Sequence, residues 1–371
     1  MDTFEIFLVA PPGLEPLLAE EARAAGFAGV TPRPGGVAIE GGWPEVWRAN
    51  LELRGAARVL ARIAEFRAMH LAQLDKRARR VDWASVLRAD LPVKVEASCR
   101  ASRIYHAGAA AERVARALTE ELGTPVTADA GLRLLVRIED DLCTISLDTS
   151  GEPLHRRGHK QAVNPAPMRE NLAALFLRDC GYDGSEAVLD PMCGAGTFVI
   201  EAAEMAAGLL PGRTRRFAFE DLPSFDAGTW SALKSRPSAP VPTVRFFGSD
   251  RDAGAIAMSR ANAERAGVGA STRFDRAAIS ELQRPKGPPG LVIVNPPYGG
   301  RIGNRRLLFG LYATLGRVLR ERFSGWRVGL ITADAGLARA TELDFAPPGP
   351  IVPHGGLKVR LWQTGALTAP H

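Results

Sequence analysis

Apolar positions in the first 150 residues recur with two periods, which predict short strands alternating with helices. Strands are expected over residues 4–9, 36–39, 57–66 and 93–98, and helices over residues 13–25, 45–53, 71–84 and 109–122. Residues 132–138 and 143–148 are expected to form a hairpin that turns at Glu139, Asp140 and Asp141. This order predicts two α+β parts, over residues 1–54 and 55–150.

The second half has a different pattern, because its apolar runs are continuous and each ends in a polar residue. Such runs are typical of parallel strands buried on both faces. They cover residues 187–190, 244–250 and 291–295, with later strands at 327–332 and 357–363 and helices at 252–266 and 307–322. Residues 151–168 read as a linker, and the irregular stretch 211–242 interrupts the pattern. The prediction is an α/β domain over residues 169–371.

The tetrapeptide Asn295-Pro296-Pro297-Tyr298 follows one of these strands, and proline ends a strand because it cannot donate to the ladder. Ligands bind at the carboxyl ends of strands in open α/β sheets. The Asn295 side-chain oxygen and the Pro296 carbonyl would accept two hydrogens of a planar amine, and Tyr298 would stack on the ring that carries it. A structural turn with a structural tyrosine is the alternative.

A glycine-containing loop joins another strand to a helix, and all of its residues are candidates for binding a ligand: Asp190, Pro191, Met192, Cys193, Gly194, Ala195, Gly196 and Thr197. Free N–H groups at the following helix start suit a carboxylate, and Asp190 suits an amino group. The loop lacks both a P-loop lysine and dinucleotide-type glycine spacing. Asp250 ends the next strand, where an acid can hold ribose hydroxyls, or cap a helix instead.

These residues resemble the THUMP-containing family of class I S-adenosylmethionine-dependent RNA methyltransferases that act on guanine N2, to which RlmL-like and TrmN-like enzymes belong. The resemblance is carried by DPMCGAGTF from Asp190, GSDRD from Gly248, NPPYGGRIG from Asn295 and the stretch from Ser150 to Ala174. It implies a Rossmann-like methyltransferase domain after ferredoxin-like (1–54) and THUMP (55–150) domains. It also implies that Asp190–Thr197, Asp250, Arg251 and Asn295 bind S-adenosylmethionine.

The same resemblance implies an RNA partner, either rRNA or tRNA. A contact surface is expected at Arg100, Arg103, Tyr105 and His106, for which an ordinary loop is the alternative, and Arg301 is expected to reach the RNA backbone. One position departs from the family: Ala278 stands where relatives carry an acid that contacts the adenine amine, and Asp275 would replace it only if the loop shifts.

Composition adds limits to this hypothesis. The 371 residues carry a formal charge of +6 with a pI near 9.4, which suits a polyanionic partner. The four cysteines lack metal-ligand spacing, so neither a metal site nor a disulfide framework is predicted. No apolar run is long enough to span a membrane and no signal peptide is visible, so the cytoplasm is expected.

Three alternatives stay open. The tetrapeptide from Asn295 to Tyr298, called the amine motif below, also suits adenine N6 or a protein glutamine amide. Ala278 raises the possibility of a non-catalytic RNA-binding protein that retains the fold. The target RNA, the target guanine and the oligomeric state are not determined by the sequence.

Overall fold

The computed structural model describes residues 3–161, 168–235, 246–298 and 305–368, which form two compact units. The first unit comprises residues 1–10, 19–154 and 214–236, and the second comprises residues 11–18, 155–213 and 237–371. Within the described ranges, no helix combines the length and the apolar character that crossing a bilayer requires.

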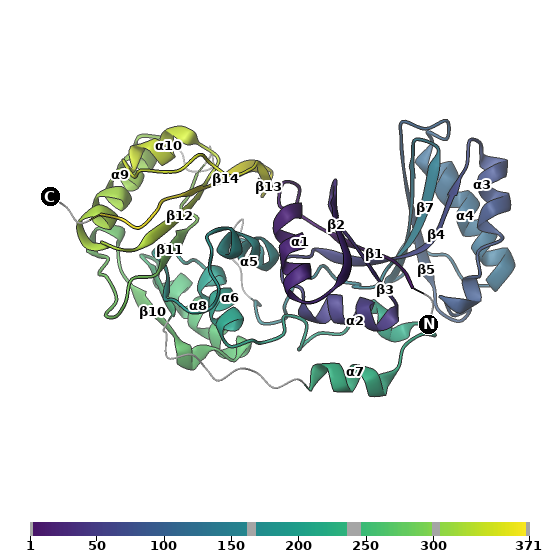
Figure 1. The fold of residues 1–371 in the computed structure, drawn as a ribbon, viewed down its shortest axis with the longest axis horizontal. Coiled ribbons are helices and arrows are strands. Elements are labelled where there is room, and N and C mark those ends of the chain that lie inside the picture. Colours follow the sequence, from purple (N-terminus) through teal and green to yellow (C-terminus); the bar gives the residue numbers. More distant parts are fainter. Residues whose placement is uncertain (1–2, 162–167, 236–245, 299–304, 369–371) are drawn as a thin grey trace. The chain divides into compact units, whose positions relative to one another are not determined.

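The first unit begins with the strand and helix order of a ferredoxin-like fold (Figure 1). Its strands pair antiparallel in the order β2-β3-β1-β4. The elements in this part of the sequence are β1 (Phe4–Val9), α1 (Glu15–Ala24), β2 (Ala28–Arg33), β3 (Gly36–Gly41), α2 (Trp43–Glu52) and β4 (Arg58–Arg67). The start of α1, up to residue 18, is grouped with the second unit. Strand β2 escaped prediction because it lies at the sheet edge, is almost wholly exposed and contains a proline, so it shows no alternation.

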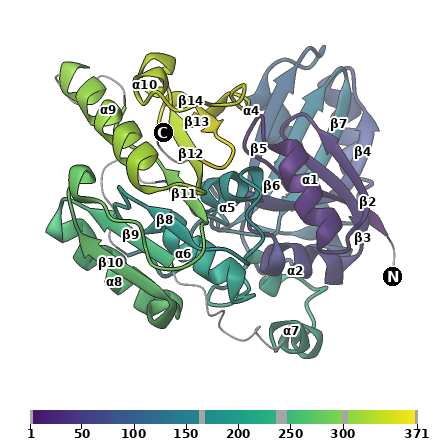
Figure 2. The same ribbon diagram turned by 60° about the vertical axis from the view of Figure 1, so that its left-hand side comes forward.

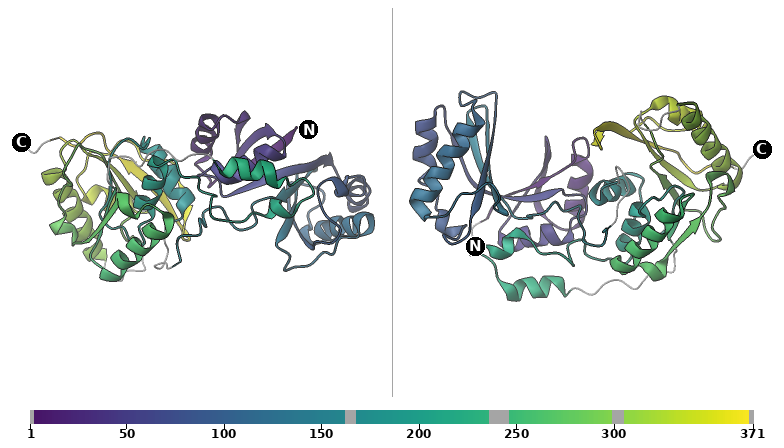
Figure 3. Two further views of the ribbon diagram at one scale, coloured as in Figure 1. Left: turned by 90° about the horizontal axis from the view of Figure 1, so that it is seen from below. Right: turned by 180° about the vertical axis from the view of Figure 1, so that it is seen from behind.

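The same sheet continues through β4 into the rest of the unit, in the order β4-β7-β6-β5. The further elements are α3 (Leu71–Ala78), a 3-10 turn (Trp83–Ser85), β5 (Val93–Arg100), α4 (Ala107–Leu122), β6 (Leu132–Glu139) and β7 (Leu142–Asp148). Helices α3 and α4 cover one face of these strands (Figures 1 and 3). The predicted helix over 71–84 was too long: it ends at Ala78, whose carbonyl accepts from the Trp83 indole N–H at 3.0 Å.

An insertion from the second half of the sequence completes the first unit. Residues 214–235 include a 3-10 turn (Ala218–Asp221) and helix α7 (Ala227–Lys234), seen near the bottom of the right-hand view in Figure 3. The rings of Phe217, Phe219 and Trp230 pack against one another, and Phe219 stacks on Trp47 of α2 with ring centroids 6.1 Å apart. The described part of this stretch therefore packs on α2 through its aromatic rings.

The second unit is built on a twisted sheet with the strand order β10-β9-β8-β11-β12-β14-β13 (Figure 2). Strands β10 to β12 run parallel, whereas β14 is antiparallel to both neighbours. The strands are β8 (Val188–Asp190), β9 (Phe246–Asp250), β10 (Thr272–Arg276), β11 (Leu291–Val294), β12 (Arg327–Thr332), β13 (Val352–His354) and β14 (Leu357–Gln363). The order reverses between β8 and β11, which is the switch point where such sheets bind ligands.

Helices cover both faces of this sheet. The helices are α5 (Glu170–Asp179), α6 (Thr197–Ala206), α8 (Ala253–Ala266), α9 (Arg305–Arg322) and α10 (Ala335–Ala340). One face forms a hydrophobic cluster with α9 and α10 that contains the fully buried Tyr312 and Trp326. The other face packs on α5, and Gly329 of β12 leaves room there for the Cys180 thiol. Strands β10 and β13 and helix α10 were not predicted.

Candidate active site

Three polar residues meet at one edge of the second sheet. Asp190 ends β8, Asp250 ends β9 and Asn295 directly follows β11. These strands are parallel and adjacent, with Asp190 opposite Gly248 and Leu291 opposite Val188. The carboxyl ends of these strands therefore place Asp190 and Asp250 on one side of the switch point and Asn295 on the other side, as the sequence predicted.

The loop from Asp190 to Thr197 turns sharply over this edge. Gly194 and Gly196 have φ values of +52° and +84°, a conformation that side chains with a Cβ rarely adopt. The Gly194 N–H donates to the Asp250 carboxylate at 3.1 Å, so the two strand ends are joined directly. Thr197 then begins α6, whose first turn offers N–H groups without helical partners.

Asp190 is an acid in an unusual environment. It is only 3% exposed, and burial raises the pKa of its carboxyl to about 8, while the charge of Asp250 adds to the increase. A hydrogen bond from the Met192 N–H at 3.0 Å acts in the opposite direction. A buried carboxyl that faces a second acid is suited to receive a cationic group.

Asp250 does not cap the following helix. The N-cap of α8 is Asp252, whose Oδ1 accepts from the Gly254 N–H at 2.7 Å. The Asp250 carboxylate accepts from the backbone of Gly194 and Asp252 at the sheet edge. The capping alternative is therefore wrong, and Asp250 faces the glycine loop. Its neighbour Arg251 is exposed.

Helix α8 supports the loop through residues that the sequence did not single out. The Ser259 hydroxyl donates to the Gly194 carbonyl at 2.7 Å, and the Asn262 amide donates to the Ala195 carbonyl at 3.0 Å. Both side chains are fully buried. Gly248 lies beneath the loop, and a Cβ there would stand 2.6 Å from Phe274 and 3.1 Å from the Cys193 Cβ. Only the tertiary contacts of the loop reveal these positions.

A lysine from the linker also holds the start of α6. The Lys160 ammonium donates to the Thr197 hydroxyl at 2.9 Å and to the Met168 carbonyl at 2.8 Å, and it lies 3.3 Å from a Glu170 oxygen. Lys160 therefore ties the glycine loop to the beginning of α5. The sequence placed this residue in a basic cluster without assigning it a role.

The amine motif presents an unsatisfied acceptor. The Asn295 Oδ1 is buried and has no hydrogen-bond partner among the described residues. The Pro297 carbonyl accepts from the Tyr312 hydroxyl at 3.3 Å, which leaves the Pro296 carbonyl as the prolyl acceptor for a substrate. Tyr298 packs partly on the hydrophobic cluster, and burial raises the pKa of its hydroxyl to about 12.

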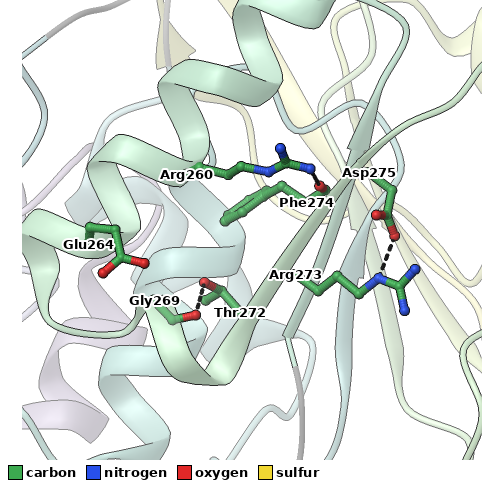
Figure 4. Close-up of a pocket in the computed structure, with 7 residues that line it drawn as sticks. All are labelled: Arg260, Glu264, Gly269, Thr272, Arg273, Phe274 and Asp275. Atoms are coloured by element: carbon green, nitrogen blue, oxygen red, sulfur yellow. Dashed lines mark hydrogen bonds and ion pairs between the residues drawn. The ribbon is translucent and has the colours of Figure 1, made fainter.

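Ala278 lies at the sheet edge that carries Asp250, whereas Asp275 does not. Ala278 follows the end of β10, at the same sheet edge as Asp250, because Arg276 is the register partner of Asp250. Asp275 lies within β10, and its exposed side chain pairs with that of Arg273 at 2.7 Å; both residues are among those that line a groove of about 280 Å³ formed by α8 and β10 (Figure 4). Asp275 therefore does not replace the missing acid in this conformation.

The residues expected to contact RNA lie in the first unit, around the loop after β5. Arg100 and Arg103 are strongly exposed, and Tyr105 is 84% exposed. His106 has a local role, since its Nδ1 caps α4 by accepting from the Ala109 N–H at 3.0 Å. Arg301 lies outside the described residues. Arg100 lies 3.4 Å from Glu139 and Arg103 lies 3.9 Å from Asp141, so both arginines have acidic neighbours, and contact between this loop and RNA stays a prediction.

Comparison with known proteins decides the family. Residues 157–346 match the family described as RMKL-like, methyltransferase domain. The chain belongs to this family. Residues 5–60 match the RlmL ferredoxin-like domain, in agreement with the observed order of strands and helices. The fold is therefore a class I methyltransferase domain preceded by a ferredoxin-like domain, as predicted, whereas the boundaries of the proposed THUMP domain stay a prediction.

Two curated relatives carry the name ribosomal RNA large subunit methyltransferase K/L. The protein from Syntrophotalea carbinolica is 38% identical over 90% of this chain and 50% of its own length. The protein from Methylococcus capsulatus is 34% identical over 91% of this chain and 48% of its own length. The chain thus spans about half the length of these relatives.

A solved structure resembles the chain over its full length. It is described as a predicted N6-adenine-specific DNA methylase from Listeria monocytogenes, and it has a TM-score of 0.89 at 26% identity. The similarity covers 100% of this chain and 97% of that one.

Proposed function

We propose that this protein is an S-adenosylmethionine-dependent methyltransferase that modifies the exocyclic N2 of a guanine in ribosomal RNA. The observation that carries the proposal is the buried Asn295 Oδ1, which has no hydrogen-bond partner among the described residues and lies at the same sheet edge as the glycine loop. The match to an RlmL ferredoxin-like domain and the names of the curated relatives favour ribosomal RNA over transfer RNA.

The residues at this edge fit the proposed cofactor. Asp190 suits the ammonium group of its methionine moiety, because that carboxyl is buried and faces another acid. The first turn of α6 suits the carboxylate, and Asp250 suits the ribose hydroxyls. When bound, S-adenosylmethionine supplies an electrophilic methyl group on a sulfonium sulfur.

The amine motif accounts for the reactivity of the nucleobase. The lone pair of an exocyclic guanine nitrogen is delocalised into the ring, so the amine is a poor nucleophile. Hydrogen bonds from its two hydrogens to Asn295 Oδ1 and the Pro296 carbonyl orient the nitrogen, and they stabilise the positive charge that it gains as its bond to the methyl forms. As this bond forms, the bond from the methyl to the sulfonium sulfur would break and leave a neutral thioether, and the extra proton would then pass from the nitrogen to solvent water. Tyr298 provides a ring on which the extruded base can stack.

The test compares two asparagines with different roles. Asn295→Ala is expected to lower kcat for methyl transfer to ribosomal RNA by about a hundredfold, a far larger effect than any change in its affinity for S-adenosylmethionine. Asn262→Ala removes the donor to the Ala195 carbonyl and is expected to weaken cofactor binding. Calorimetric titration and transfer of labelled methyl measure the two effects. Turnover of Asn295→Ala close to wild type would contradict the proposal.

Methylation of adenine N6 is a second candidate, because the structural relative is described as a predicted N6-adenine-specific DNA methylase. Mass spectrometry of nucleosides from the modified RNA distinguishes the two products. Recovery of N6-methyladenosine in place of N2-methylguanosine would favour this candidate. If no S-adenosylmethionine binds at all, the protein is instead an RNA-binding member of the fold, in line with Ala278.

A further inference from the structure

A buried tyrosine of α9 contacts the backbone of the amine motif. Tyr312 has no exposed surface, and its hydroxyl lies 3.3 Å from the Pro297 carbonyl oxygen and 3.4 Å from the Thr332 hydroxyl. Thr332 is the last residue of β12, the strand next to β11. The hydroxyl of Tyr312 therefore joins the ends of two neighbouring strands at the catalytic edge.

The direction of each hydrogen bond follows from the groups involved. A carbonyl only accepts, so Tyr312 donates its proton to Pro297. Thr332 Oγ1 accepts from the Asp334 N–H at 3.2 Å. If the single Tyr312 proton is donated to Pro297, the donor in the 3.4 Å contact between the two hydroxyls is Thr332. Asp334 is the N-cap of α10. A continuous chain of donors thus runs from the start of α10 to the motif, and each bond polarises the next.

The contact between the Tyr312 hydroxyl and the Pro297 carbonyl restrains a backbone torsion of the amine motif that the prolines leave free. The pyrrolidine rings fix φ of Pro296 and Pro297. Asn295 and Pro296 each precede a proline, which restricts both to extended conformations. Of the torsions from ψ of Asn295 to ψ of Pro297, only ψ of Pro297 lacks such a restraint, because Tyr298 follows it. The direction of the Pro297 carbonyl reports this torsion, and Tyr312 holds that carbonyl.

We propose that Tyr312 is a positioning residue for methyl transfer: its hydroxyl holds the Pro297 carbonyl and thereby aims the Tyr298 ring at the target base. This inference rests on the proposed function. Burial raises the pKa of Tyr312, so the hydroxyl stays protonated and able to donate throughout the neutral pH range. Holding reacting groups in place lowers the entropic cost of the chemical step, so the loss is expected in kcat.

The experiment uses Tyr312→Phe in the full chain, with Tyr182→Phe as the matched control. Tyr182 is also buried, and its hydroxyl donates to a backbone carbonyl of α6, that of Ala202, at 2.8 Å. Both variants remove one buried hydroxyl from the same unit and are expected to lower the melting temperature similarly. Only Tyr312→Phe is expected to lower kcat for labelled methyl transfer to ribosomal RNA, by about tenfold, with KM for RNA and cofactor affinity within twofold of wild type.

A second readout does not depend on the substrate. Tyr298 has the first backbone N–H after the two prolines, and its hydrogen exchange is expected to accelerate in Tyr312→Phe but not in Tyr182→Phe. Equal kcat in both tyrosine variants, or unchanged exchange at Tyr298, would overturn the inference. If the wild type methylates no RNA, the proposed function fails, while the exchange experiment still decides whether Tyr312 holds the motif.

Thr332→Val tests whether the donors act as one chain. This variant removes the hydroxyl that donates to Tyr312, so it is expected to lower kcat less than Tyr312→Phe does. Combined with Tyr312→Phe, it is expected to cause no further loss of kcat, because the bond that it supports is already absent. If the double variant loses kcat by the product of the two single effects, Thr332 does not act through Tyr312, and the proposed chain of hydrogen bonds would be wrong.

Discussion

Replacing Asp190 by asparagine is expected to stabilise the cofactor-free protein while removing the proposed contact of the Asp190 carboxylate with the ammonium group of the cofactor. The Asp190 carboxyl has an ordinary pKa of 3.8, which burial raises to about 8. Its folded pKa lies above its unfolded pKa, so between these values the folded state binds the extra proton and stability falls as pH rises. The loss of folding free energy that buried Asp190 causes therefore grows from about pH 4 to pH 8 and is constant at higher pH.

The size of this effect follows from the distance between pH 7 and the unfolded pKa. Keeping Asp190 protonated at pH 7 costs on the order of 4 kcal/mol of folding free energy, at about 1.4 kcal/mol per pH unit. Asparagine removes that cost and keeps an oxygen acceptor for the Met192 N–H, but its buried NH2 group costs about 1–2 kcal/mol. The net gain is about 2–3 kcal/mol, or roughly 4–10 °C in melting temperature.

The assay is thermal unfolding of the cofactor-free protein from pH 5 to pH 9. Asp252→Asn is the matched control, because Asp252 also accepts a backbone N–H but is exposed, and asparagine is an equally good N-cap. The difference in melting temperature between Asp190→Asn and the wild type should grow with pH and level off near pH 8. The affinity of this variant for S-adenosylmethionine is expected to fall at least tenfold. A melting temperature at or below wild type at pH 7, with Asp252→Asn unchanged, would refute the reasoning.

Two further predictions concern the loop support and the RNA surface. Gly248→Ala places a methyl 2.6 Å from Phe274 and is expected to destabilise the protein by about 1–3 kcal/mol and weaken cofactor binding; Gly310→Ala, which meets no atom within 4 Å, serves as control in melting and titration experiments. Arg100→Ala with Arg103→Ala is expected to weaken RNA binding and reduce the slope of log affinity against log salt by about 1–2. An unchanged slope would exclude these arginines as phosphate contacts.

Much of the site could be predicted from local sequence because its parts are local. The continuous apolar run before Asn295 indicates a buried strand, and two prolines indicate where it ends. The glycines of the cofactor loop likewise mark a turn that needs positive φ. Parallel strands of one sheet end at a common edge, so the sequence already implied that Asp190, Asp250 and Asn295 lie together.

Other features depend on residues distant in the chain, and no local pattern reports them. Strand β2 is an exposed edge strand that exists because β3 pairs with it, and the aromatic insertion gains its order from Trp47 of α2. Similarly, nothing near Asn262 indicates that its amide supports the Ala195 carbonyl.

The sequence by itself therefore determined the kinds of element, the fold class and the chemical groups at the catalytic edge, because periodicity and turn chemistry act over a few residues. Only the tertiary structure decided the environment of those groups: that Asp190 is buried beside a second acid, that Asp275 turns away into another groove, and that Tyr312 reaches the motif. Burial and hydrogen bonding between distant segments arise from packing, which the order of residues specifies only through the complete fold.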